Sequence, residues 1–242
     1  MASLVGGWPP LLAAVALAAV HLLAGHVRSL GVLPRSSWLS AGAGASVAYV
    51  FVHLLPELAV GHRVVGALQM LGGSLDRYVY LVALAGFVLF YGLETLARRR
   101  APRESDAVSP GVFWIHVGSF SVYNALIGYL LVHRESGGRV ALALFAVAMA
   151  LHVLVNDHGL RAHFRDRYHD HGRWLLSAAV VGGWAVGQAV AVREAVLHLL
   201  FAVLAGGVVL NVIKEELPEH RESRFWPFLL GAAGYAAVLL AV

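Results

Sequence analysis

Two polar pairs near the middle of the chain have the residue types and spacing of a small cation site. Ser121 and Asn124 are three residues apart and His152 and Asn156 are four apart, so each pair shares one face of a helix. Imidazole nitrogen suits transition metals, and amide or hydroxyl oxygen can complete the coordination. On facing helices these side chains could bind a metal ion or line a path. Alternatively, they are hydrogen bonds between helices, for which Ser, Asn and His are ordinary residues.

The segments that carry these pairs are apolar, and similar segments recur along the whole chain. Hydrophobic residues make up 59% of the chain and charged residues 13%, whereas about a quarter of a soluble domain is charged. A run of about twenty apolar residues can cross a bilayer. We therefore predict an all-α polytopic membrane protein, a single transmembrane domain over residues 1–242. Its eight predicted spans are residues 9–26, 38–60, 78–97, 111–133, 140–160, 174–192, 195–216 and 225–241.

The basic residues predict the orientation of these spans. Of 18 Lys and Arg residues, thirteen fall in the connectors after spans one, three, five and seven, and five in the others. Because basic connectors stay on the cytoplasmic side, both termini are expected outside the cytoplasm, in a plasma (inner) membrane. Residues 98–110 are then a cytoplasmic linker. Membrane orientation also explains the net charge of +4 without nucleic acid as a partner, and the absence of cysteine excludes disulfides and thiolate metal sites.

Two segments of the chain resemble each other. Residues 43–57 read AGASVAYVFVHLLPE and residues 205–219 read AGGVVLNVIKEELPE, with identical residues at seven of fifteen positions. The copies lie in spans two and seven, five steps apart, so they would cross the membrane in opposite directions. This predicts an inverted repeat of helices 1–3 and 6–8 around a central hairpin of helices 4 and 5, a plan common in transporters. Chance similarity between Gly-rich helices that end in proline is the alternative.

Two further groups of polar residues lie near the ends of spans. His53, Glu57 and Glu215 could form a polar vestibule, although residues of this kind at span ends are more often interfacial or paired. Residues 161–173 are predicted to form a His- and Arg-rich cytoplasmic loop, and such tracts can bind metal weakly. The histidines in and beside this loop are His158, His163, His169 and His171. A solvated loop without metal is an equal alternative, because the arginines repel cations and occupy the aspartates.

Three stretches resemble the ZIP (zinc- and iron-transporter-like) family of divalent metal transporters. They are GASVAYVFVHLLPEL in span two, LAGFVLFYGLETLARRR in span three and AGGVVLNVIKEELPE in span seven. The resemblance covers nearly the whole chain. It implies eight spans with both termini outside, an inverted repeat of the outer triplets, and metal ligands on spans four and five.

The ligand positions depart from the family pattern. Aligned on the family motifs, Ser121, Asn124, His152 and Asn156 occupy ligand positions, while the mid-span carboxylates of the pattern are missing. Asp157 falls one residue past the expected face, so it could act as a ligand only if the helix is locally unwound or the alignment shifts by one residue. Neutral ligands leave the ion its full charge, and burying a charge costs several kcal/mol. With the carboxylates missing, either the metal site is single and weaker, or the protein has the ZIP architecture without ZIP transport.

The expected function is ZIP-like transport of a divalent metal cation, zinc or a similar ion, between helices 4 and 5. The alternative is a ZIP-fold homologue that has lost metal transport and serves as a sensor, partner subunit or carrier of another solute. We do not expect an enzyme or a tightly bound cofactor; a hydrolytic zinc site and a bis-His haem carrier are weaker hypotheses. The expected partners are the lipid bilayer and the ion. Small-residue stretches also permit close contacts within one chain or in a homodimer.

Overall fold

The computed structural model describes residues 7–23, 35–67, 78–99, 110–133, 138–213 and 224–241. Within these ranges the regular structure is entirely helical and contains no strand. The helices are α1 (Trp8–Leu23), α2 (Arg35–Tyr49), α3 (Leu55–Ala67), α4 (Tyr78–Arg99), α5 (Pro110–Val132), α6 (Arg139–Arg167), α7 (Arg173–Ala189), α8 (Glu194–Asn211) and α9 (Phe225–Leu240). Two π-helical turns, η2 (Val50–Leu54) and η4 (Tyr168–Gly172), connect α2 to α3 and α6 to α7.

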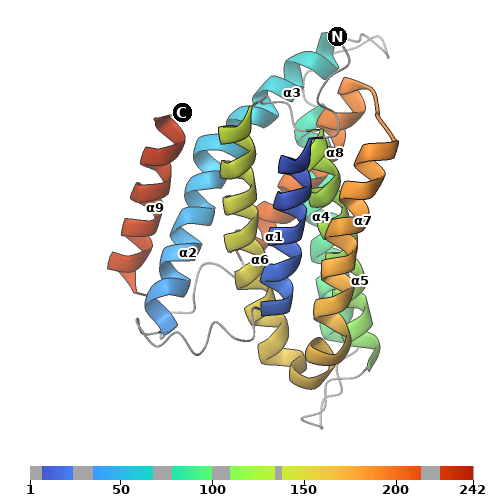
Figure 1. The fold of residues 1–242 in the computed structure, drawn as a ribbon, viewed down its shortest axis with the longest axis vertical. Coiled ribbons are helices and arrows are strands. Elements are labelled where there is room, and N and C mark those ends of the chain that lie inside the picture. The colour runs from blue at the N-terminus through green and yellow to red at the C-terminus, as the bar shows by residue number, and fades with distance from the viewer. Residues whose placement is uncertain are drawn as a thin grey trace.

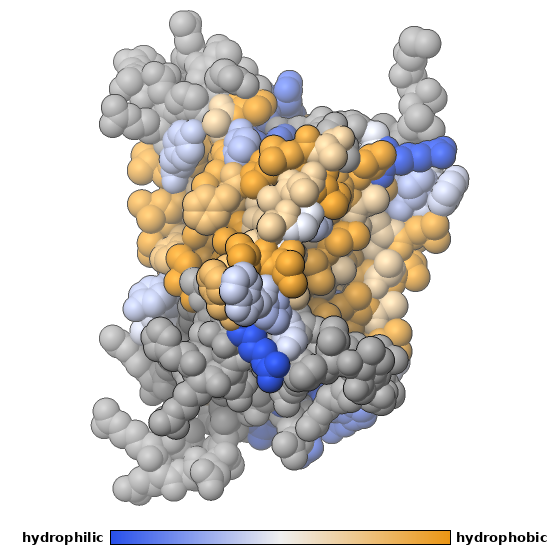
Figure 2. Space-filling view, turned by 90° about the vertical axis from the view of Figure 1, so that its left-hand side faces the viewer, coloured by the Kyte–Doolittle hydropathy of each residue, from blue (hydrophilic) through white to orange (hydrophobic). Residues whose placement is uncertain are grey.

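A helix lies on each of the eight predicted ranges. Four helical segments are long and apolar enough to cross a membrane: Ser40–Gly61, Gly111–Val132, Arg139–Arg161 and Glu194–Asn211. Three shorter apolar helices are Trp8–Leu23, Tyr78–Leu93 and Phe225–Leu240. Figure 2 shows apolar side chains gathered across the middle of one face of the molecule. These features agree with an integral membrane protein whose apolar surface faces lipid.

The helices lie side by side in one bundle (Figure 1), and glycines permit their closest contacts. Between α2 and α9, a Cβ at Gly44 would collide with the carbonyl oxygen of Phe228, and a Cβ at Gly231 with that of Ala41. The collisions are with backbone, which cannot move aside as a flexible side chain can. The two helix backbones therefore touch directly, an approach that only small residues allow.

The same reciprocal contact occurs between α4 and α8. A Cβ at Gly206 would meet the carbonyl oxygen of Ala83, and one at Gly86 would meet that of Val203. Gly206 holds the same position in residues 205–219 as Gly44 holds in residues 43–57. The contact between α5 and α7 repeats the arrangement once more, with glycines at positions 128 and 183.

The α2 and α8 helices also share a change of helical winding. A π-helical turn begins at Val50, and π-helical hydrogen bonding follows α8 at Val212 and Ile213, where the described range ends. Val50 and Val212 occupy equivalent positions in the two similar segments. π-helical turns inside α-helices are rare and frequently lie at functional sites.

The prediction of a loop at residues 161–173 is wrong, because this connector is helical. Helix α6 continues to Arg167, with one non-helical residue at Phe164, and η4 leads directly into α7. Leu160, Phe164 and Tyr168 are spaced four apart and pack in one buried cluster with Phe113. The connector therefore has its own apolar face, which holds it against α5. The predicted linker over residues 98–110 begins in α4, and its residues 100–109 lie outside the described ranges.

Candidate functional site

A group of buried polar side chains crosses the apolar core between α1, α5, α6 and α8. Such groups are costly in a protein interior unless they are hydrogen-bonded to one another. The group is called the polar array below, and its members are His21, Tyr123, Asn124, His152, Asn156, Asp157 and Asn211. Asp157 is 0% exposed and is the only acidic side chain among the buried residues that the structure describes.

His21 on α1 connects α5 and α6 within the polar array. Its Nδ1 lies 3.0 and 2.9 Å from the two carboxylate oxygens of Asp157, and its Nε2 lies 3.0 Å from Oδ1 of Asn124. The amide of Asn124 is oriented by its own Nδ2, which donates to the carbonyl oxygen of Phe120 at 2.9 Å. The Oδ1 of Asn124 therefore faces His21 as an acceptor, and Nε2 of His21 carries a proton.

The hydrogen bonds also fix the charge of the His21–Asp157 pair. An ionised carboxylate only accepts hydrogen bonds, so Nδ1 of His21 must donate to it as well. With protons on both ring nitrogens, His21 is an imidazolium and Asp157 its carboxylate partner. Moving the Nδ1 proton onto Asp157 would leave the total charge of the pair unchanged. In either form one proton lies between Nδ1 and the carboxylate, and the pair is neutral overall.

Tyr168 on η4 closes the end of the polar array beside His21. Its hydroxyl donates to the backbone carbonyl of His21 at 3.4 Å, and its ring is buried. Burial, together with the nearby Asp157 carboxylate, raises the pKa of Tyr168 above its usual value, so the hydroxyl remains a donor. Ser177 on α7 adds a hydrogen bond of 3.0 Å to the carbonyl of Ala18. The end of α1 is thus held by both η4 and α7.

His152 is the second centre of the polar array. Three groups lie around its Nε2: the Tyr123 hydroxyl at 3.1 Å, Nδ2 of Asn156 at 3.1 Å and Nδ2 of Asn211 at 3.5 Å. They come from α5, α6 and α8. One lone pair cannot accept three good hydrogen bonds, so this arrangement has more donors than the nitrogen needs.

Rotation of the amides resolves this excess. The Oδ1 of Asn156 is buried and has no hydrogen-bond partner within the described residues. A rotation by half a turn about the last side-chain bond exchanges the amide nitrogen and oxygen of asparagine. Asn156 and Asn211 can therefore both direct Oδ1, in place of Nδ2, toward Nε2 of His152. His152 would then be surrounded by one phenolic and two amide oxygens.

The three separations from Nε2 of His152 are hydrogen-bond lengths, and they can also be compared with the ligand separations of a small cation site. Zinc bonds of about 2.0–2.1 Å to nitrogen and oxygen give a tetrahedron with edges of about 3.3–3.4 Å. The three separations from Nε2, at 3.1, 3.1 and 3.5 Å, fall around that value. The ligands would all be neutral. No cluster of three or more His, Asp or Glu side chains that could hold a metal occurs in the described ranges.

Four of the five predicted metal ligands belong to the polar array. Asn124, His152, Asn156 and Asp157 are all buried there, whereas Ser121 is half-buried on α5. As a metal ligand, Asp157 was expected to require local unwinding of the helix or a shift of the alignment by one residue. Helix α6 is regular at this point, and Asp157 faces α1 while Asn156 lies beside His152.

Three members of the polar array were not predicted from the sequence. His21 has no other polar residue of the array near it in sequence, since its partner Asp157 is 136 residues away. Tyr123 precedes Asn124 directly, and Asn211 lies inside the second copy of the repeated segment. The position of Asn211 in that segment was the one available signal, because it places an amide in the middle of an apolar helix.

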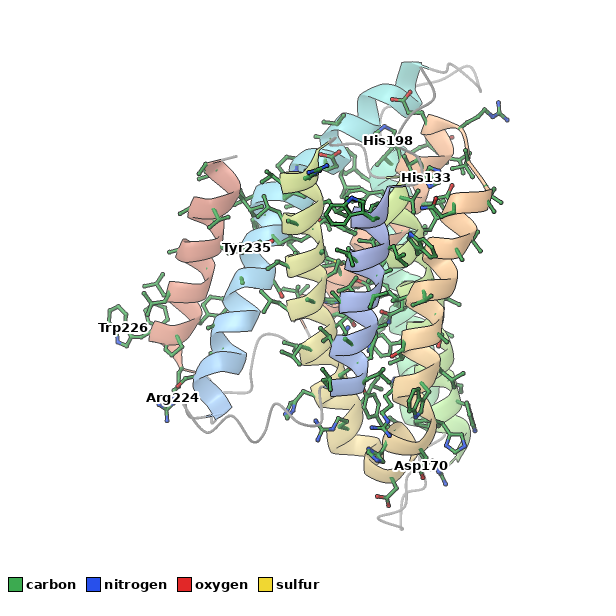
Figure 3. All side chains as sticks on the ribbon, viewed as in Figure 1. His133, Asp170, His198, Arg224, Trp226 and Tyr235 are labelled. Carbon is green, nitrogen blue, oxygen red and sulfur yellow. The ribbon has the colours of Figure 1, made fainter. Side chains whose placement is uncertain are left out.

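The remaining candidate residues lie away from the polar array. His53, in η2, packs its ring on that of Tyr49, with the two ring centroids 5.1 Å apart. Glu57 is half-buried in α3, and Glu215 lies outside the described ranges. His169 and His171 are exposed on η4, at the same end as Asp170 and opposite the end that holds His133 and His198 (Figure 3). His158 is half-buried on α6, and His163 lies on the same helix.

No protein-family model matches this chain, and no curated protein matches it either. The function is therefore argued from the polar array itself.

Proposed function

We propose that this chain is a ZIP-like membrane transporter that carries a divalent metal cation, zinc or a similar ion, through the region between α5 and α6. The observation that carries the proposal is the convergence of Tyr123, Asn156 and Asn211 on Nε2 of His152. Polar residues inside a membrane are expensive and usually mark a substrate or ion path. Here they come from three helices and meet at one buried point.

The proposal includes an inverted repeat, in which α1–α4 and α7–α9 are related halves. Its support is the pair of equivalent glycine contacts, Gly44 against α9 and Gly206 against α4. The π-helical winding at Val50 and Val212 supports it too, as do the opposite directions of α2 and α8 in the bundle (Figure 1). Transporters built this way bind their substrate between the halves. Five members of the polar array lie on α5 and α6, between the two halves in sequence, whereas His21 lies on α1 and Asn211 on α8.

The neutral ligand set fits a carrier better than a storage site. An ion bound only by His152, Tyr123 and amide oxygens keeps its full charge, so desolvation is poorly offset and binding is weak. A carrier must release its ion at the opposite face, and weak binding favours release. Rocking of α5 and α6, with α7 packed on α5, against the tightly packed helix pairs α2/α9 and α4/α8 would expose the site alternately to the two sides.

A second candidate is a ZIP-like scaffold that no longer transports metal and serves as a sensor, partner subunit or carrier of another solute. The observation that favours it is the His21–Asp157 pair, which occupies the one buried carboxylate of the described core. Divalent sites normally use carboxylates to offset the charge of the ion.

Equilibrium dialysis of purified protein against Zn²⁺ separates the two candidates. The proposed function predicts saturable binding of one ion to the parent and its loss in His152→Ala. His133→Ala is the matched control. His133 directly follows α5, and its ring stacks on Tyr129 outside the polar array. Equal Zn²⁺ binding by the parent and His152→Ala would rule out the proposed site. Absence of Zn²⁺ binding to the folded parent would favour the second candidate.

A further inference from the structure

The start of α7 places a cation without a described acidic partner at one end of the bundle. Arg173 is the first residue of α7, directly after η4, at the end that Asp170 marks in Figure 3. Its side chain is half-buried, its Nε is buried without a hydrogen-bond partner, and it forms no ion pair with a described residue. A partly desolvated charge that lacks a counter-charge is costly. An anion bound at this position would therefore be stabilising.

The guanidinium group of Arg173 is held in place, and a second cation lies nearby. Its Cζ lies 5.2 Å from the centroid of the Trp174 ring, in a cation–π arrangement. The charges of Arg161 on α6 and of Arg173 both act on the Tyr168 hydroxyl, so the two guanidinium groups approach the same part of the bundle. Arginines on two helices provide the forked donors that suit a phosphate group.

The acidic residues of the connector do not cancel this positive charge. Residues 158–173 contain four arginines and two aspartates, an excess of two positive charges with histidine neutral. The two aspartates, Asp166 and Asp170, are both exposed, and Asp157 is engaged with His21. The connector is therefore complementary to an anion. The predicted orientation places it on the cytoplasmic side, where anionic lipids give the membrane surface a negative potential.

Beside Arg173, α7 presents an exposed apolar face with small side chains. Trp174, Ala178, Gly182 and Ala185 follow one another at intervals of three to four residues and are all exposed. No atom lies within 4 Å of a Cβ placed at Gly182, so the space outside the helix is open there. An exposed tryptophan at the end of an apolar helix is typical of the membrane–water interface. A cation at the interface, followed by an open apolar face, fits an amphiphile with an anionic head group and an acyl chain.

We propose that the start of α7 is a binding site for an anionic phospholipid. Its phosphate contacts Arg173 and Arg161, and an acyl chain lies along the exposed face of α7 at Gly182. The apolar face favours a lipid over free phosphate, which has no acyl chain to place there. Ser177 of the same helix donates to the carbonyl of Ala18 at 3.0 Å, so a lipid bound here also holds the turn that supports α1. The inference does not depend on the proposed function, because none of the lipid contacts belongs to the polar array.

The test measures the dissociation constant of the first bound lipid by native mass spectrometry of the detergent-solubilised protein. The parent is expected to bind phosphatidylglycerol at least about tenfold more tightly than phosphatidylcholine, because each cation near an anionic head group favours it about fivefold. Arg173→Gln should lose about fivefold in affinity for phosphatidylglycerol. Arg193→Gln is the matched control, since it removes the same charge from an exposed position at the other end of α7. An equal loss in both variants would overturn the proposal, because it would show a response to net charge alone.

Gly182→Leu tests the acyl-chain contact without changing a charge or replacing Arg173. Leucine would fill the open space and should weaken phosphatidylglycerol binding at least about threefold, because each methylene that loses its contact lowers the affinity. Gly92→Leu, at an equally open position on α4, should leave binding unchanged. Inorganic phosphate and glycerol phosphate should not displace the lipid. Displacement by either compound would assign the site to free phosphate and overturn the proposal, as would equal binding of the two lipids by the folded parent.

Discussion

His21 and Asp157 are 136 residues apart in the chain, and in the folded protein the imidazole Nδ1 lies 2.9 and 3.0 Å from the two carboxylate oxygens. The contact joins α1 to α6 close to the end of α1, where Tyr168 of η4 also packs. Neither side chain reaches water, since they are 1% and 0% exposed. Because both side chains are buried, the loss of either one would change the stability of the bundle and the charge of its core.

Removing one partner of this pair should destabilise the protein strongly. His21→Leu and Asp157→Leu are each expected to lower the free energy of unfolding by about 3–5 kcal/mol, because each leaves an unpaired polar group in the core. The double variant should lose clearly less than the sum of the two. Reversible unfolding in mixed detergent micelles gives these values. Additive losses would show that the two side chains do not act as a pair.

The glycines at the helix contacts make a second prediction with internal controls. Gly183→Ala should lower the free energy of unfolding by about 1–3 kcal/mol or more, because its Cβ would meet the backbone carbonyl of Ala125. The neighbouring Gly182→Ala is the control, since no atom lies within 4 Å of its Cβ position. Alanine there should be neutral or stabilising, because it lowers the entropy of the unfolded chain.

The equivalent positions in the repeated segments extend this comparison. Gly44→Ala and Gly206→Ala should cost similar amounts, whereas Gly42→Ala should not, because its Cβ position is open within 4 Å. Melting temperatures in one detergent would rank the variants. A large loss at position 42, or none at positions 44 and 206, would contradict the helix packing described above.

The helices could be predicted from the sequence because each is a long apolar run, and the lipid environment makes such runs unambiguous. The connector at residues 161–173 could not be predicted correctly in the same way. Its histidines and arginines suggest a solvated loop, while its helical structure depends on Phe164 and Tyr168 packing against α5. Buried aromatic residues four apart were the signal, and the surrounding charges obscured it.

The site could be predicted only where its residues are close together in sequence. His152 and Asn156 share a helical face, and the structure places them in one cluster. Asn211 joins that cluster from α8, and His21 on α1 contacts Asn124 and Asp157 instead. Spacing within one segment contains no information about such contacts. Ser121 was predicted as a ligand from its spacing to Asn124, but only Asn124 faces the core fully.

The absence of cysteine from the chain permits a direct test of the predicted orientation. His169→Cys places a thiol on exposed η4, and Ala191→Cys places one in the exposed connector after α7. A membrane-impermeant thiol reagent applied to intact cells should label position 191 and leave position 169 unlabelled until the membrane is opened. Labelling of position 169 alone in intact cells would show that the orientation is opposite to the predicted one.

The exposed histidines of η4 should be dispensable for transport. His169→Ala/His171→Ala removes two side chains that face solvent at one end of the bundle, so Zn²⁺ flux should change by less than about threefold, as for other exposed substitutions. Initial rates at several Zn²⁺ concentrations would measure this. Loss of flux comparable to that of His152→Ala would assign the connector a direct role in binding.

The central claim is that a neutral site around His152 carries a divalent ion across the membrane. It is tested most directly by Zn²⁺ flux into proteoliposomes that enclose a zinc-responsive dye, with the parent, His152→Ala and His133→Ala reconstituted at equal density. The proposal predicts saturable uptake by the parent and His133→Ala, and loss of uptake in folded His152→Ala. Equal uptake by the parent and His152→Ala would contradict it, as would the absence of flux of zinc, iron, manganese or cadmium through well-folded parent.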